Sequence, residues 1–109
     1  MAPGGSLGSS GRETLVFTLP GDPALSRLGR LVASHFLRQN GVKGAVARRG
    51  AMAVERGLRK LLTGAARSGG RVRAIVLVLQ PKPRVLEVTG KRAGGPRTRL
   101  LTLARPRPA

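Results

Sequence analysis

An unbroken aliphatic run, Ala74 to Leu79, constrains the fold of this chain more than any other stretch. Aliphatic residues with no polar residue between them are typical of a strand that is covered on both faces. Such a strand lies at the centre of a sheet or at a subunit interface. Pro81 and Pro83 end it, because proline has no backbone N–H for the strand ladder. The rest of the chain must therefore supply the elements that cover this strand.

Two stretches whose apolar residues have helical spacing are candidates to cover this strand. The first runs from Asp22, a predicted N-cap, to Asn40-Gly41, where both residues tolerate the left-handed cap conformation. The second is predicted from Ala51 to about Ala66, and Gly57 inside it favours a close approach of a neighbouring helix. The apolar residues at helical spacing are Leu25, Leu28, Val32 and Phe36 in the first helix, and Val54, Leu58, Leu61 and Ala65 in the second.

Shorter apolar or alternating segments predict the remaining strands, which are Glu13–Leu19, Lys43–Ala47, Arg84–Thr89 and Arg99–Ala104. The predicted order is strand, helix, strand, helix, then two or three further strands. We therefore predict an α+β fold, a two-layer β-α-β-α-β-β(β) sandwich with two helices on one face of a four- to five-stranded sheet.

The 109 residues fit one domain with two tails. Residues 1–12 are rich in Gly, Ser and Pro and predict a disordered tail, 13–104 the domain, and 105–109 a basic, proline-rich tail. The N-terminal residues lack the pattern of a signal peptide, and no apolar run reaches the roughly 18–20 residues of a membrane span. We expect a cytoplasmic, nucleoid-associated protein with no membrane partner.

The charge balance is one-sided and indicates an anionic partner. Lys and Arg number 21 against 4 Asp and Glu, which gives a formal net charge of +17. Repulsion at that charge opposes compaction unless a partner neutralises it, and nucleic acid is the commonest such partner. An apolar fraction of 40% is enough for a core, which must be aliphatic because aromatic residues make up only 2%.

The segment Arg48-Arg49-Gly50 is the sharpest candidate site. It is predicted to form the turn that enters the second helix, where free backbone N–H groups and two guanidinium groups together favour a phosphate. Arg56, Arg59 and Lys60 follow on the outer side of that helix and would support the contact. Arg59 can also pair with Glu55 at i, i+4.

A second basic segment is the predicted hairpin tip from Gly90 to Thr98. Small residues separate its cations, so that it could enter a groove as an arm. The arm residues are Lys91, Arg92, Arg97 and Arg99. Single-stranded RNA is usually recognised on exposed aromatic side chains, and both aromatics, Phe17 and Phe36, are at predicted core positions. The sequence therefore favours duplex DNA, bound through its backbone, with RNA as a possible ligand.

Catalytic patterns are absent from the sequence. His35 is the single histidine, and its apolar neighbours favour packing over proton transfer. The four acids are scattered, no metal-ligand spacing or phosphate-loop motif occurs, and the lack of cysteine excludes disulfides and thiolate metal sites. We expect a protein without catalytic residues, metal or cofactor.

Several strings resemble the Alba superfamily of small chromatin and RNA-binding proteins, and its bacterial stage V sporulation protein S family in particular. The similar strings are Leu37 to Gly41, Ala47 to Met52, Val85 to Gly90 and Arg99 to Arg107. The resemblance implies a homodimer, backbone contact from Arg48 and Arg49, and a groove-binding arm from Lys91 to Arg99. The lysines that archaeal members carry after the first strand are replaced by Gly21-Asp22, and the acidic hairpin of the sporulation family is basic here.

Two alternatives share parts of this pattern. The predicted strand–helix order is similar to the RNA-binding C-terminal half of translation initiation factor 3. The string Ala53-Val54-Glu55, followed by a helix, strands and a Gly-rich turn, resembles anti-sigma factor kinases of the histidine-kinase-like ATPase family. That family holds magnesium with an Asn four residues after the Glu, where this chain has Arg59, and it has an Asp near Gly90-Lys91 that is missing here. The resemblance to the anti-sigma factor kinases implies a module that has lost ATP binding and acts by binding a protein.

Overall fold

The computed structural model describes residues 13–67, 74–92 and 95–106. In this part of the chain one strand is followed by two helices and three further strands. The elements are β1 (Leu15–Pro20), a short 3-10 helix η2 (Pro23–Leu25), α1 (Ser26–Gln39), α2 (Gly44–Arg67), β2 (Ala74–Pro81), β3 (Val85–Arg92) and β4 (Arg97–Ala104).

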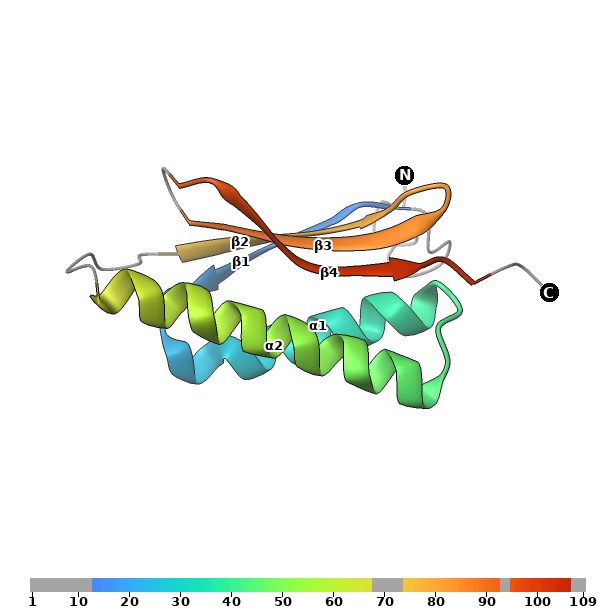
Figure 1. The fold of residues 1–109 in the computed structure, drawn as a ribbon, viewed down its shortest axis with the longest axis horizontal. Helices are drawn as coiled ribbons and strands as arrows, with labels where there is room; N and C mark the ends of the chain where they lie inside the picture. Colours follow the sequence, from blue (N-terminus) through green and yellow to red (C-terminus); the bar gives the residue numbers. More distant parts are fainter. Residues whose placement is uncertain (1–12, 68–73, 93–94, 107–109) are drawn as a thin grey trace, which may run out of the picture.

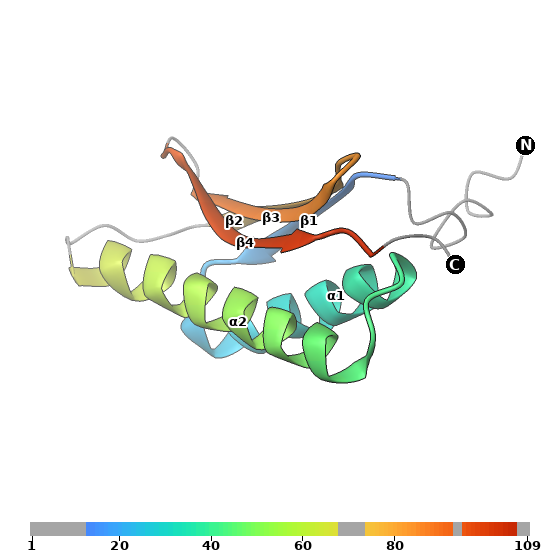
Figure 2. The same cartoon turned by 45° about the vertical axis from the view of Figure 1, so that its right-hand side comes forward.

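The strands form one antiparallel sheet, and both helices pack on the same face of it (Figures 1 and 2). The strand order in the sheet is β1-β2-β3-β4, so each strand pairs with its neighbour in sequence. In Figure 1, α2 lies in front beneath β4 and α1 lies behind it. The predicted α+β class, with two helices on one face of a four-stranded sheet, is confirmed.

The aliphatic run occupies β2, between β1 and β3, so its central place in the sheet is confirmed. Residues 13–67, 74–92 and 95–106 cover only one of its faces. Ile75, Leu77 and Leu79 point to the helices and are buried, whereas Val76 and Val78 lie on the opposite face and are partly exposed.

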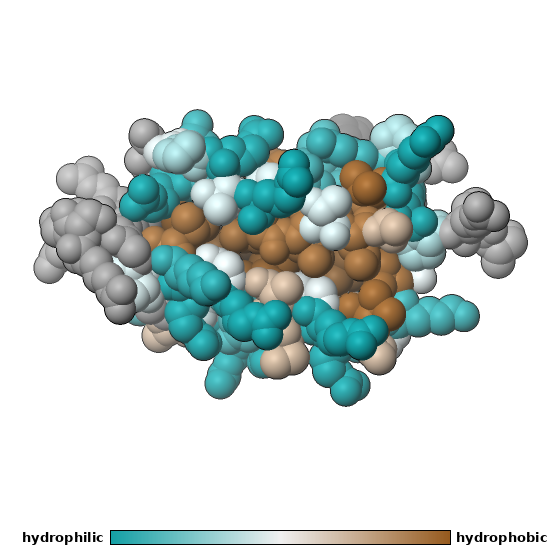
Figure 3. Space-filling model, viewed as in Figure 1, coloured by the Kyte–Doolittle hydropathy of each residue, from teal (hydrophilic) through white to brown (hydrophobic). Residues whose placement is uncertain are grey.

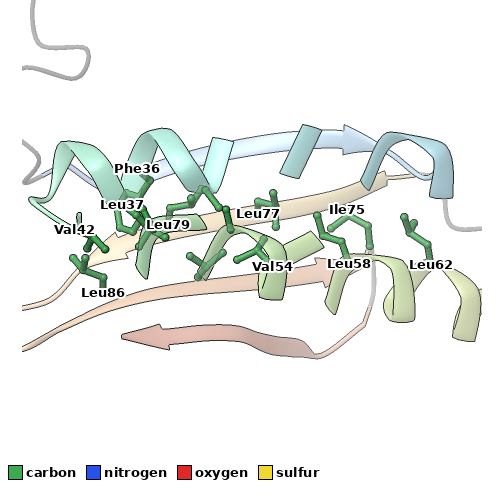
Figure 4. Close-up of a cluster of buried hydrophobic side chains, with 14 residues drawn as sticks. Phe36, Leu37, Val42, Val54, Leu58, Leu62, Ile75, Leu77, Leu79 and Leu86 are labelled. Carbon is green, nitrogen blue, oxygen red and sulfur yellow. The ribbon is translucent and has the colours of Figure 1, made fainter. Parts of the chain in front are cut away.

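The core lies between the helices and the sheet and is almost entirely aliphatic (Figure 4). Leu58 and Val54 of α2 meet Ile75 and Leu77 of β2 there, with Phe36 of α1 at one end. The other aromatic, Phe17, pairs with the buried Leu77 and so faces the helix side as predicted, but on the edge strand β1 it stays 37% exposed.

The predicted strand Lys43–Ala47 is wrong, since α2 already begins at Gly44. The chain reverses at Gly41, which has a φ of 85°, and the N–H of Ala47 then donates to the Lys43 carbonyl over 2.9 Å. Ala47 and Ala51 are buried on the same face as Val54. The helical spacing of buried residues therefore begins at Ala47, before the first large apolar residue on that face. The observed order is therefore strand, helix, helix, strand, strand, strand, in place of β-α-β-α-β-β(β).

The first helix also starts later than predicted, and its buried face is shifted around the helix, although Phe36 is buried and Val32 packs against the core as predicted. The carboxylate of Asp22 accepts a hydrogen bond from the N–H of Ala24, but that turn is the 3-10 helix η2. Small residues Gly29 and Ala33 face the core, while Leu28 is 40% exposed. Large apolar side chains alone therefore misplaced the buried face.

Glycines set how closely α2 approaches its neighbours. A Cβ on Gly29 of α1 would overlap Leu58 of α2, so the two helices meet where a side chain is missing. A Cβ on Gly57 would come within 2.7 Å of the Leu100 side chain. The predicted close approach at Gly57 is confirmed, but the neighbour is the strand β4 and not a helix.

The predicted hairpin arm is mostly part of the sheet. β3 continues to Arg92 and β4 begins at Arg97, and Lys91 pairs with Arg97 in the ladder. Arg105 is attached to the turn between β2 and β3, because it donates to the carbonyl oxygens of Lys82 and Arg84. The predicted tails at 1–12 and 107–109 lie outside the described residues.

Candidate nucleic-acid interface

The cations of α2 form a row along its outer face. Arg49, Arg56 and Lys60 follow at i, i+7 and i+11, which places them on one side of the helix, and all three are exposed. We call these three residues the α2 row. At a rise of 1.5 Å per residue the row spans about 16 Å along the helix axis. Over that length a DNA duplex presents about ten phosphate charges.

The predicted phosphate-binding turn at 48–50 does not exist, because these residues lie inside α2. The free N–H groups of a helix belong to its first turn, which starts here at Gly44. Gly50 is buried against Leu37 and Leu101 and cannot reach a ligand. Arg48 and Arg49 keep exposed side chains, so only the guanidinium half of the predicted site remains.

Arg59 differs from the α2 row because its charge is already paired. Its guanidinium lies 3.2 Å from the carboxylate of Glu55, as the i, i+4 spacing predicts. Arg30 of α1 lies 3.5 Å from the other oxygen of the same carboxylate. The side chain of Glu55 is only 14% exposed, and this carboxylate joins the two helices.

The hairpin cations divide between the two faces of the sheet. Lys91, Arg97 and Arg99 share the face opposite the helices, and we call them the hairpin cluster. Arg92 pairs with the buried Ile75, which places it on the helix side, and it is half-buried. The Arg99 guanidinium lies 3.9 Å from the carboxylate of Glu87, and its side chain is 70% exposed.

The predicted pair of sites is not brought together. Arg48 and Arg49 belong to the first turns of α2, and Figure 1 shows that end of α2 and the hairpin ends of β3 and β4 at opposite ends of the long axis. That axis measures 48 Å. The α2 row bridges part of this separation, because α2 runs back alongside β4 towards the hairpin. Lys60 is its member nearest the hairpin end.

The acids in the described part of the chain are largely occupied by internal partners. Asp22 binds the N–H of Ala24, Glu55 is bridged by two arginines, and Glu87 lies between Lys82, at 3.0 Å, and Arg99. Glu13 is exposed at the start of the described chain. Among the described residues, the α2 row and the two hairpin residues Lys91 and Arg97 have no such ion pair, so these surfaces are strongly cationic.

The chain matches no protein-family model, curated protein or solved structure. Neither α1 nor α2 is long and apolar enough to cross a membrane.

Proposed function

We propose that this protein binds duplex nucleic acid through the phosphate backbone, with little dependence on base sequence and with DNA favoured over RNA. The observation that supports the proposal is the distribution of charge: the described acids other than Glu13 have internal partners, while the α2 row is exposed and forms no ion pair with any described residue. Exposed Arg and Lys side chains neutralise phosphates, and contacts to phosphate carry no information about base sequence. The α2 row and the hairpin cluster are the surfaces that would do so, in a nucleoid-type or regulatory role.

An Alba-like identity is a further part of the proposal, and only local strings support it. Helix one ends at Asn40-Gly41 as the resemblance implies, whereas the hairpin of β3 and β4 is basic where that of the sporulation family is acidic. The observed succession of two helices lacks the strand expected between them. Binding by charge therefore does not depend on this family.

A homodimer also belongs to the proposal. The sheet face opposite the helices carries Val16, which is 61% exposed, beside Val78 on the next strand. Packing of two such faces would give β2 its second cover. Sedimentation should show dimers at micromolar concentration, and monomers alone at those concentrations would contradict this part.

Salt dependence tests the central proposal. If about 5–8 phosphates are neutralised, the logarithm of the DNA-binding constant should fall with the logarithm of salt concentration with a slope of about −4.5 to −7. The triple variant Arg49→Ala, Arg56→Ala, Lys60→Ala should make the slope about 2.7 less negative on every sequence. Its matched control is Arg27→Ala, Arg38→Ala, Arg84→Ala, which removes the same charge from other exposed positions.

A long-range charge effect alone would change binding equally in both triple variants, and that result would refute an interface on α2. Affinity without salt dependence would refute the proposal as a whole. Affinities for duplex RNA and for single strands, measured beside the affinity for duplex DNA, show which nucleic acid is preferred. A clear preference for single-stranded RNA would favour the RNA-binding alternative instead.

One observation favours a second candidate, a protein-binding module related to the anti-sigma factor kinases. Glu55 lies in α2, and the next elements along the described chain are strands, in the order that the resemblance implies. The position of the magnesium-holding Asn is Arg59, whose guanidinium is bonded to Glu55 itself. The residues present therefore do not fit a nucleotide-bound metal. Co-purification of a protein partner that survives nuclease treatment would support this candidate, and its loss with the nucleic acid would count against it.

A further inference from the structure

An apolar strip lies between the two layers, where α2 faces β4. Figure 3 shows it as a continuous band, with hydrophilic side chains above it, over the sheet, and below it, over α2. Gly50 and Gly57 contact Leu101 and Leu100, which identifies this face of α2. Residues at helical spacing with these glycines belong to the same face. The strip consists of Val46, Ala53 and Leu61 from α2 and Leu100, Leu101 and Leu103 from β4.

The strip is incompletely covered by the described chain. Val46 is 39% exposed, and Leu61 and the three leucines of β4 are only partly buried. The leucines in the middle of the core, such as Leu58 and Leu77, are at most 1% exposed. The contrast shows an apolar surface that the two layers leave open on this side.

The strip borders the outer edge of β4. This strand is last in the sheet order, and no strand among residues 13–67, 74–92 and 95–106 pairs with its outer side. A sheet edge presents backbone N–H and C=O groups to an incoming strand. An added strand would place alternate side chains over the strip, and those between them on the open face of the sheet.

The charges around the strip define what kind of strand fits. The α2 row follows its helix side, with Arg49 and Arg56 exposed, while Arg97 and Arg99 project from β4 on the other side. We propose that the edge of β4 binds an extended segment of a partner protein in which apolar and acidic residues alternate. The apolar residues cover the strip, and the acidic ones meet Arg97 and Arg99 on the open face of the sheet. This partner goes beyond nucleic-acid binding and does not depend on it.

Other occupants fit less well. Nucleic acid would use the cations but has no aliphatic side chains for the leucines, and the strip has no aromatic residue on which a base could stack. A second copy of this chain that paired along the same edge would set the Arg97 and Arg99 of its own β4 beside cations of the same sign. An acidic and apolar strand satisfies both features of the surface, which is also how strand-addition modules combine affinity and specificity.

A synthetic probe can test this on the full chain. The probe is an acetylated, dye-labelled peptide of sequence Glu-Val-Glu-Leu-Glu-Val-Glu-Leu, whose eight residues match the length of β4. Two controls carry the same dye: octaglutamate, and a peptide of the same composition with its apolar residues grouped together. The alternating peptide should bind at least about tenfold more tightly than either control. Hydrogen exchange should slow at the amides of β4.

A matched pair of variants locates the site. Val46→Glu and Met52→Glu add the same charge to the same helix at residues that are 39% and 43% exposed. Met52 lies about 240° around the helix axis from Val46, away from the strip. Val46→Glu should weaken the alternating peptide about tenfold, and Met52→Glu no more than about twofold.

Each contrary result overturns the inference. Equal affinity for octaglutamate would show attraction by charge alone, and equal loss in both variants would place the peptide elsewhere. Binding without slower exchange in β4 would exclude strand addition. If a DNA duplex displaces the peptide and Val46→Glu weakens both ligands equally, the strip is a nucleic-acid surface. DNA binding is measured separately on the same variants. If the peptide does not bind, the inference about the strip is refuted, while the proposed nucleic-acid binding is decided by the DNA measurements alone.

Discussion

The two flanks of α2 differ in how completely the fold closes them. Towards α1, Leu58 fits over Gly29 and is 1% exposed, and the carboxylate of Glu55 binds Arg30 across the helix pair. Towards β4, Gly57 contacts Leu100, which stays partly exposed. No ion pair in the described part of the chain joins α2 to β4.

The difference separates the helix surface that holds the fold from the surface that is available to a partner. On the α1 flank, both the apolar contact and the charges are used internally. On the β4 flank, leucines remain partly uncovered and the cations of the α2 row remain unpaired. The α1 flank of α2 thus stabilises the fold, while the β4 flank is available to a partner. The variants below test this difference between the two flanks.

The largest effect is expected from a methyl group on the closed flank. Gly29→Ala places a Cβ against Leu58, which is enclosed and cannot move aside. Overpacking of about 1–3 kcal/mol should outweigh the helix-propensity gain of up to about 1 kcal/mol. We expect a net loss of about 1–2 kcal/mol in the free energy of unfolding, measured by urea denaturation.

The same change on the open flank should be almost neutral. In Gly57→Ala the methyl group meets Leu100, which can turn towards solvent, and the gain in helix propensity offsets that shift. Gly44→Ala is the control, because a Cβ there meets nothing within 4 Å. Equal losses at Gly29 and Gly57 would show that both flanks are equally rigid, contrary to the comparison.

The sequence predicted the layers of this fold better than the connections between them. The run 74–79 predicted the central strand, and helical spacing at Val54 and Leu58 predicted the face of α2 that is buried. The start of α2 was missed because its first buried residues are alanines, which carry little apolar signal of their own. The face of α1 was misplaced for a related reason, since Gly29 and Ala33 are buried and the larger Leu28 is exposed.

The candidate site was predictable in composition but not in geometry. The exposed positions of Arg49, Arg56 and Lys60 follow from helical spacing once α2 is known to begin at Gly44. The apolar strip was not predicted, because it needs the pairing of β4 with β3 and its contacts with Gly50 and Gly57. Such contacts between distant segments are not encoded in any local pattern.

A smaller effect is expected from the carboxylate that closes the α1 flank. Glu55→Gln keeps the shape of the side chain but removes the charge that binds Arg30 and Arg59. Because both arginines are substantially exposed, we expect a loss of only about 0.5–1 kcal/mol in unfolding free energy. The loss should shrink in 1 M salt, where screening is strong.

Glu13→Gln is the matched control for that variant, since it changes the net charge equally at an exposed position without a recorded ion pair. If both variants lose the same stability, general charge repulsion accounts for the effect, and the bridge between α1 and α2 contributes nothing of its own.

The smallest effect distinguishes paired from unpaired cations on α2. Arg56 forms no ion pair within the part of the chain that the structure describes, whereas Arg59 already binds Glu55 at 3.2 Å. A cation that contacts phosphate releases a counterion, so Arg56→Ala should make the salt slope of DNA binding about 0.9 less negative. Arg59→Ala removes the same charge but should change the slope much less, because Glu55 competes with phosphate for that guanidinium. Titrations of one DNA duplex over a range of salt concentrations measure both slopes. Equal changes in the two variants would mean that phosphate displaces the ion pair, and then the closed flank of α2 would take part in binding as fully as the open one.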